Sequence, residues 1–180
     1  GSGQADIVFV LDISTSMSNE INGVKNNIVE FVDSLNYRHV DFQLGMVTFI
    51  DEVINTYEFS KDHIQFQNTV NNLGVLNNGN VTWPENSLDA LYQASQLQFR
   101  QKANRVFIWI TDADYHERNN FTDYSRNDII NILLLNNITV HSIGAAEFQT
   151  EWYNSIIEPT GGNFYDINGN FRDILLDISR

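Results

Sequence analysis

Short, almost purely apolar runs alternate along this chain with longer segments whose apolar residues recur every three to four positions. Residues 6–11 and 105–110 have the length of strands and little polar interruption, which is typical of strands buried on both faces. Residues 138–143 are expected to form a third buried strand. After the first run, apolar residues form one helical stripe from Ile21 to Leu35. Because parallel strands need a crossover connection that is usually a helix, this alternation predicts an α/β fold.

We expect a doubly wound, Rossmann-like, mostly parallel six-stranded sheet with one antiparallel edge strand and helices on both faces. Residues 53–59 follow the strand at 41–49 after only Ile50-Asp51-Glu52, too short for a crossover, so they should form the antiparallel strand. The other expected strand is at residues 163–167.

Helix starts are expected from capping residues. Ser60 should cap a helix that runs toward Leu73, and Pro84 should open a helix at its first turn. Further helices are expected near residues 125–136, 151–157 and the C-terminus.

The chain has 180 residues with 42% hydrophobic and 18% charged residues, enough for one domain with a hydrophobic core. Residues 1–3, Gly-Ser-Gly, look like a cloning remnant, and we expect residues 4–180 to be a single domain of a larger multidomain protein. No apolar run approaches the roughly 20 residues of a membrane span, so direct membrane insertion is not expected.

Charge and cysteine content exclude several kinds of partner. The net charge of −13 and the pI near 4.4 argue against nucleic acid or an anionic membrane as the main partner. The absence of cysteine excludes disulfides and zinc–thiolate sites.

Three polar loops carry the candidate chemistry, at residues 12–16, 82–85 and 111–114. The first and third follow strands that should be neighbours where the strand order of the sheet reverses, and ligand sites form outside the carboxyl ends of strands at that point. Convergence of the loops would bring Asp12 and Asp112 together, with Glu85 and Asp114 as further candidates.

Two carboxylates about 4 Å apart repel by roughly 4 kcal/mol at an effective dielectric near 20. A cation removes this repulsion, and a set of carboxylate and hydroxyl ligands favours Mg²⁺, Ca²⁺ or Mn²⁺. The sequence therefore predicts one divalent cation. The alternative is that Ser14 and Ser16 merely cap the following helix and Asp12 closes a turn.

Over essentially its whole length the chain resembles a von Willebrand factor type A domain. In that family an Asp-x-Ser-x-Ser motif, a loop Thr and a Thr-Asp pair form the metal-ion-dependent adhesion site. The resemblance implies that three hydroxyls bind the cation and that two carboxylates hold it directly or through waters; these residues are Ser14, Ser16, Thr82, Asp12 and Asp112. It also implies an open coordination position that takes an Asp or Glu carboxylate from a protein ligand.

The motifs are most similar to those of the integrin β-subunit version of the domain. In that version the Glu after Pro also contacts the metal, which implies Glu85 as a further ligand. A second, adjacent site there uses two Asp residues after the serines. Asn19 and Glu20 stand at those positions, so they are only weak candidates for such a site.

Aromatic residues beside these loops suggest a binding rim. Trp83 and Tyr115 could anchor a ligand, or they could pack onto the sheet end and a neighbouring helix. His116 is expected to order its own loop. Residues 166–170 resemble the start of an EF-hand loop, but Phe171 replaces the required Gly, so a polar turn that caps the last helix is favoured.

We therefore expect an extracellular or cell-surface binding or adhesion module, not an enzyme. Two alternatives remain: a structural or assembly subunit of a surface or ATPase-linked complex, and a metal-dependent hydrolase. The hydrolase is disfavoured because aspartate-nucleophile phosphatases need Asp-x-Asp where this chain has Ser14.

Overall fold

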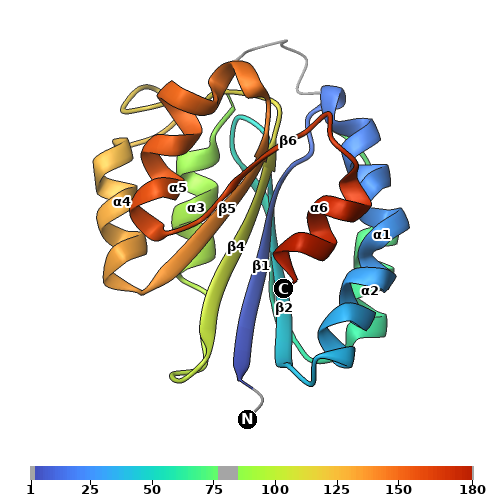
Figure 1. Ribbon diagram of the computed structural model, residues 1–180. Coiled ribbons are helices and arrows are strands. Elements are labelled where there is room, and N and C mark those ends of the chain that lie inside the picture. Colours follow the sequence, from blue (N-terminus) through green and yellow to red (C-terminus); the bar gives the residue numbers. More distant parts are fainter. Residues whose placement is uncertain (1–2, 77–84, 180) are drawn as a thin grey trace.

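The computed structural model describes residues 3–76 and 85–179, in which a six-stranded sheet lies between two layers of helices (Figure 1). The sheet order is β3-β2-β1-β4-β5-β6, with only β3 antiparallel to its neighbour. The strands are β1 (Gln4–Asp12), β2 (Asp41–Phe49), β3 (Val53–Ser60), β4 (Asn104–Thr111), β5 (Ile138–Gly144) and β6 (Phe164–Asp166). The predicted fold class is confirmed.

Helices α1, α2 and α6 cover one face of the sheet, and α3, α4 and α5 cover the other (Figure 1). None of these helices in the described ranges is long and apolar enough to cross a membrane. Their bounds are α1 (Ser18–Tyr37), α2 (His63–Asn71), α3 (Ser87–Ser95), α4 (Arg126–Leu135), α5 (Asn154–Thr160) and α6 (Phe171–Ile178). Short turns of other helical types precede α1 and α5, namely η1 (Thr15–Met17), η2 (Ala146–Phe148) and η3 (Gln149–Tyr153).

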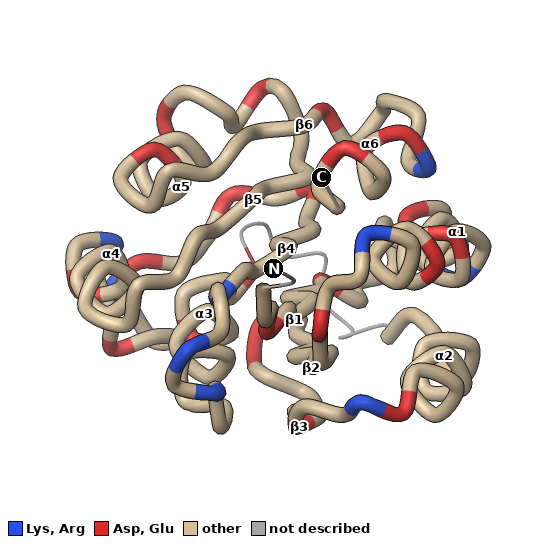
Figure 2. Tube along the Cα trace, turned by 60° about the horizontal axis from the view of Figure 1, so that its bottom comes forward, with Lys and Arg blue, Asp and Glu red and all other residues tan. Residues whose placement is uncertain are grey.

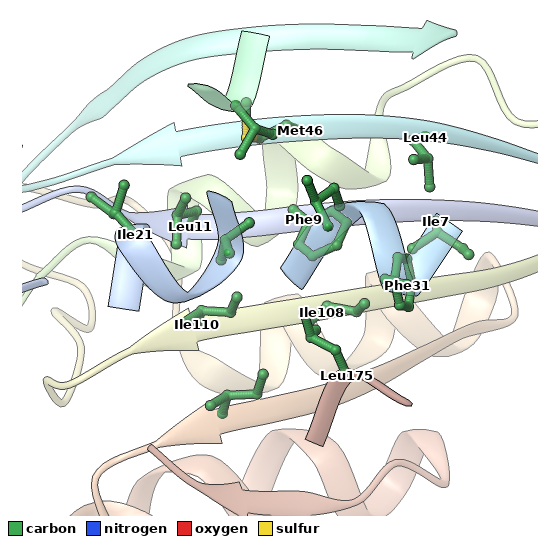
Figure 3. Packing of buried hydrophobic residues seen from close by; sticks show 14 of the residues in the cluster. Ile7, Phe9, Leu11, Ile21, Phe31, Leu44, Met46, Ile108, Ile110 and Leu175 are labelled. Carbon is green, nitrogen blue, oxygen red and sulfur yellow. The ribbon is translucent and has the colours of Figure 1, made fainter. Parts of the chain in front are cut away.

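The central strand β1 supplies both halves of the core. Its alternate side chains Ile7, Phe9 and Leu11 face α1 and α6 (Figure 3), while Val8 and Val10 face the opposite helical layer. All are buried, and each such side chain contributes about 1.5–3 kcal/mol when removed from water. This burial on both faces explains why the sequence of β1 is a continuous apolar run.

Helices α2 and α3 begin later than predicted. Helix α2 is capped by Asp62, whose carboxylate accepts from the Gln65 amide at 3.0 Å, while Ser60 ends β3. Helix α3 begins at Ser87 and is capped by Asn86; Pro84, the predicted first-turn residue, lies outside the described residues. Asn170 caps α6, as expected for the polar turn.

At the amino end of the parallel strands, Arg100 binds two carboxylates. Its Nε donates to Asp6 Oδ1 at 2.8 Å and its Nη1 donates to Asp41 Oδ1 at 2.9 Å. Asp6 is fully buried and also accepts from the Arg100 backbone amide at 2.7 Å. This ion-pair cluster ties β1, β2 and the connection between α3 and β4 together.

The first and last described residues lie close to one another. Gln4 begins β1, and the Ser179 carbonyl after α6 accepts from Arg38 Nη1 at 2.7 Å. Gly3, Gln4 and Ser179 line one cavity of about 250 Å³.

Candidate metal centre

The ends of β1 and β4 meet where the strand order reverses. Thr111 Oγ1 donates to Asp12 Oδ2 at 2.8 Å, and the Ser14 amide donates to Asp12 Oδ1 at 2.8 Å. Asp12 is fully buried, so both of its oxygens are held in fixed directions. The register of the two strands, in which Leu11 pairs with Ile110, creates this contact.

Ser14 and Ser16 present their hydroxyls together after β1, with Oγ atoms 3.4 Å apart. Neither η1 nor α1 has a side-chain cap hydrogen bond at its start, and the residue at the α1 cap position is Met17. Helix capping by Ser14 therefore does not account for this pair of hydroxyls.

Backbone hydrogen bonds bring Glu85 to the same edge of the sheet. The Glu85 amide donates to the Asp114 carbonyl at 3.2 Å, and the Glu85 carbonyl accepts from the His116 amide at 3.0 Å. The next amide, from Asn86, donates to the Ile50 carbonyl at 2.9 Å. Glu85 is thus fixed between the β2–β3 connection and the loop after β4, and it is 7% exposed.

Three carboxylate oxygens at this edge are buried without a hydrogen-bond partner in the described part of the chain. They are Glu20 Oε2, Glu85 Oε2 and Asp112 Oδ1. An unsatisfied buried acceptor costs about 1–3 kcal/mol, and more when it is charged. The three oxygens come from separate segments of the chain.

The pKa values of three carboxyl groups at this edge of the sheet are raised. Burial raises the pKa of Glu85 to about 8, and the charges of Asp12, Asp51 and Asp112 add to the shift. Burial likewise raises the pKa of Asp12 to about 6, against the lowering effect of hydrogen bonds from Ser14 and Thr111. Burial, and then the charge of Asp112, also raises the pKa of Glu20. The carboxylates therefore sense one another electrostatically.

The available donors fit a hard divalent cation, because they are carboxylate and hydroxyl oxygens. Among residues 3–76 and 85–179 no group of three or more His, Asp or Glu side chains has the arrangement of a metal cluster. A cation here would therefore depend on the hydroxyls of Ser14 and Ser16 as well as on carboxylates.

The remaining sequence candidates divide in three ways. Thr82 and Trp83 lie outside the described residues. Asp114 is half-buried, and its pKa is raised by burial. Asn19 is exposed in the first turn of α1, while Glu20 beside it contributes one of the unpaired oxygens.

Of the two alternatives for Tyr115, packing into the core is confirmed and a place at a ligand rim is not. Tyr115 is 1% exposed, and its hydroxyl donates to the Trp152 carbonyl at 3.1 Å. Its ring packs against Trp109 and Trp152, because the pairing of Glu85 with this segment turns Tyr115 into the core. His116 orders its loop, as expected: its Nδ1 is 2.8 Å from Asn119 Nδ2 and its ring stacks on Phe121.

Two residues that support the centre are not among the individual residues predicted from the sequence. Thr111 holds Asp12, as described above, and Tyr153 donates through its hydroxyl to the Ala113 carbonyl at 2.7 Å. Tyr153 is fully buried, and a Cβ on Gly144 would lie 2.4 Å from its ring, so this position admits only glycine. Thr111 could have been found from its place beside Asp112; nothing in the sequence spacing marks Tyr153.

Comparison with known proteins assigns the fold to a family. The family model described as von Willebrand factor type A domain matches residues 6–178. Two curated relatives are each 25% identical over 62% of this chain: alpha-protein kinase vwkA of Dictyostelium discoideum and integrin beta-PS of Drosophila melanogaster. The chain spans only 19% and 16% of their lengths, respectively.

Solved structures share the fold at low identity. Proximal thread matrix protein 1 from the mussel byssus superposes with a TM-score of 0.74 at 18% identity, over 99% of this chain and 45% of that protein. An aerotolerance-related membrane protein from Bacteroides fragilis gives a TM-score of 0.69 at 14% identity, over 97% and 96% of the two chains.

Proposed function

The chain belongs to the von Willebrand factor type A domain family, whose members commonly mediate protein interactions, and we propose that it is a cation-dependent binding module. Its ligand is a protein that offers an Asp or Glu carboxylate. Its place of action is outside the cell or at the cell surface, and it is not an enzyme.

The observation that carries this proposal is the set of unpaired buried oxygens of Glu20, Glu85 and Asp112. Water or a neighbouring donor normally satisfies such atoms, and a divalent cation satisfies several at once. Ser14 and Ser16 hydroxyls and the Asp12 and Asp112 carboxylates would hold the cation, with Glu85 beside them. Thr82 remains a predicted ligand.

A cation at this edge also explains how an acidic protein could bind an acidic ligand. The chain carries a net charge of −13, and acidic residues lie on elements of both helical layers (Figure 2). A partner carboxylate that approached Asp12, Glu85 and Asp112 alone would be repelled. The bound cation supplies the attraction, and the chain's own side chains fix its position.

The hydrolase alternative has less support. Aspartate-nucleophile phosphatases need Asp-x-Asp, and this chain has Ser14 at the second position. Ligand binding is therefore the proposed chemistry.

The first test measures thermal unfolding with excess Mg²⁺, Mn²⁺ or Ca²⁺ and with EDTA, for the wild type and for Asp112→Asn. A cation at 100 times its dissociation constant stabilises the folded state by about 2.7 kcal/mol, so the wild type should melt higher with metal. Asp112→Asn should lose most of that gain, because it removes a carboxylate at the centre.

Asp33→Asn is the matched control, since Asp33 is exposed on α1 and the charge change is the same. The control should keep the full gain. Equal melting temperatures of the wild type with metal and with EDTA would refute the proposed cation site.

A further inference from the structure

A second cavity, of about 390 Å³, opens beside α3 at the same edge of the sheet as the candidate metal centre. Its walls include Asp89, Tyr92, Phe121, Asp123 and Tyr124. Nothing in the proposed metal chemistry uses it.

The carboxylate of Asp89 is held rigidly at this cavity. Thr122 Oγ1 donates to Asp89 Oδ1, and Asn86 Nδ2 donates to Asp89 Oδ2 at 2.9 Å. Asn86 Nδ2 also donates to the Phe121 carbonyl at 2.8 Å. This hydrogen bond fixes the loop that carries Phe121. Each carboxylate oxygen can accept a second hydrogen bond, so Asp89 keeps capacity for a ligand while its orientation is already set.

Aromatic rings form the rest of the wall. Tyr92 and Tyr124 stack with ring centroids 4.8 Å apart at an interplanar angle of 30°. Phe121 stacks on His116 and is 43% exposed. Ring faces beside carboxylates are the surroundings that favour organic cations.

The electrostatic environment points the same way. Asp89 and Asp123 contribute negative charge, and no Lys or Arg is among the described residues that line the cavity. Burial, and then Tyr92, Asp89 and Asp123, raise the pKa of Tyr124, as expected where negative charge is disfavoured. The nearby cations of the following segment are paired elsewhere, Arg118 with Asp128 and Arg126 with Glu117.

We propose that this cavity binds an arginine side chain of a protein partner. A planar guanidinium can stack on a tyrosine ring and donate to a carboxylate at the same time, which the ammonium of lysine does less well. The free amino acid arginine would also place its α-carboxylate at the cavity, where none of the described lining residues is a Lys or Arg that could pair with it. An arginine within a polypeptide lacks that charge. The proposal does not depend on the metal centre.

The test is a titration monitored by NMR chemical shifts of the amides at residues 89–93 and 120–124. It uses protein made without N-glycosylation, because Asn120 begins an Asn-Phe-Thr acceptor. The probes are N-acetyl-arginine N-methylamide, its uncharged citrulline counterpart and free arginine. Each is titrated with Mg²⁺ and with EDTA into the wild type, Asp123→Asn, Tyr124→Leu and the control Asp33→Asn.

The capped arginine should give saturable shifts at those amides, with and without EDTA. The citrulline probe should bind about tenfold more weakly, which corresponds to ~1.4 kcal/mol, and free arginine should also bind more weakly than the capped form. Asp123→Asn and Tyr124→Leu should each weaken binding about threefold, and Asp33→Asn should not.

Equal binding of the citrulline probe, absence of saturable shifts, or binding that disappears in EDTA would each overturn the proposal. The metal centre is tested separately, because Asp112→Asn should retain arginine binding whether or not the domain binds a cation.

Discussion

Asp12 illustrates how a single residue depends on its neighbours. A fully buried carboxylate is normally paired with a cation, yet Asp12 is held by the Thr111 hydroxyl and the Ser14 amide. These hydrogen bonds orient the charge without neutralising it. The Thr111–Ala113 segment beside it is oriented in turn by Tyr153. A buried core residue therefore helps to position the candidate metal centre.

We predict that Tyr153→Phe lowers the free energy of unfolding by about 1 kcal/mol, because the Ala113 carbonyl loses a buried donor. The same change should weaken cation affinity, because Asp112 lies within the segment that the hydroxyl fixes. Urea unfolding and metal titration measure the two effects.

Tyr165→Phe is the control for this substitution. It removes a hydroxyl that donates to Asp177 of α6 at 2.6 Å. Because no candidate metal ligand lies on α6, this change should leave cation affinity unchanged. If Tyr153→Phe also leaves affinity unchanged, Tyr153 does not position the loop.

Some individual residues of the site could be predicted from the sequence, and others could not. Asp12, Ser14 and Asp112 could be chosen from the sequence because polar residues at the carboxyl ends of neighbouring strands converge. Glu85 is suggested by the family resemblance. Tyr115 could not be placed correctly, since an aromatic residue after a strand can face solvent or core. Only the pairing of Glu85 with that segment decides between them.

At the scale of secondary-structure elements, the strands were more predictable than the helix starts. A strand buried on both faces is typically a continuous apolar run, and β1 and β4 each have one. A helix start depends instead on one capping hydrogen bond. Ser60 and Asp62 both offer an oxygen, and only the length of β3 decides that Asp62 caps α2.

The elements at the amino edge are joined by the Arg100 cluster, which leads to a prediction about stability. Arg100→Leu should lower the free energy of unfolding by about 3–5 kcal/mol, because it leaves the buried Asp6 carboxylate uncompensated. The double substitution Arg100→Leu with Asp6→Leu should recover much of that loss, since no charge then remains buried.

Chemical unfolding of the single and double variants measures this coupling. Lys61→Leu removes another partner of Asp41, an ion pair at 3.4 Å between largely exposed groups, and should cost much less. A loss for Arg100→Leu as small as that for Lys61→Leu would show that the cluster does not stabilise the fold.

For the molecule as a whole, the raised pKa values of Asp12 and Glu85 predict how stability changes with pH. In EDTA the folded protein keeps protons that the unfolded chain releases, between the ordinary pKa values of 3.8 and 4.5 and the folded values of about 6 and about 8. Stability should therefore fall as the pH rises through that range. A divalent cation binds the deprotonated groups, so its stabilising effect should grow over the same range.

Urea unfolding of the wild type and Glu85→Gln in EDTA, at pH values from about 5 to about 8, isolates one group. The variant should have a shallower pH dependence, particularly above about pH 6, because residue 85 no longer titrates. Parallel curves for the two proteins would mean that Glu85 is ionised in the fold throughout this range. Matched concentrations of NaCl control for the general repulsion of an acidic chain.

The overall architecture was predictable because it follows from the alternation of strand-length and helical segments, which pervades the chain. The chemistry of the arginine pocket was not, since Asp89, Phe121 and Tyr124 converge only through packing of α3 against the loop before α4.

The positions of the first and last described residues have a consequence for how the domain could be attached to other molecules. Gly3 and Ser179 border one cavity, and the length of β1 places Gln4, in the wall of that cavity, roughly 25 Å from Asp12. A polypeptide joined near both residues would lie on one side of the domain, so a tether would hold the domain with its carboxyl edge facing outward. Their proximity also favours insertion into a surface loop of a host protein. Such a fusion would offer an oriented sensor surface for the binding measurements described above.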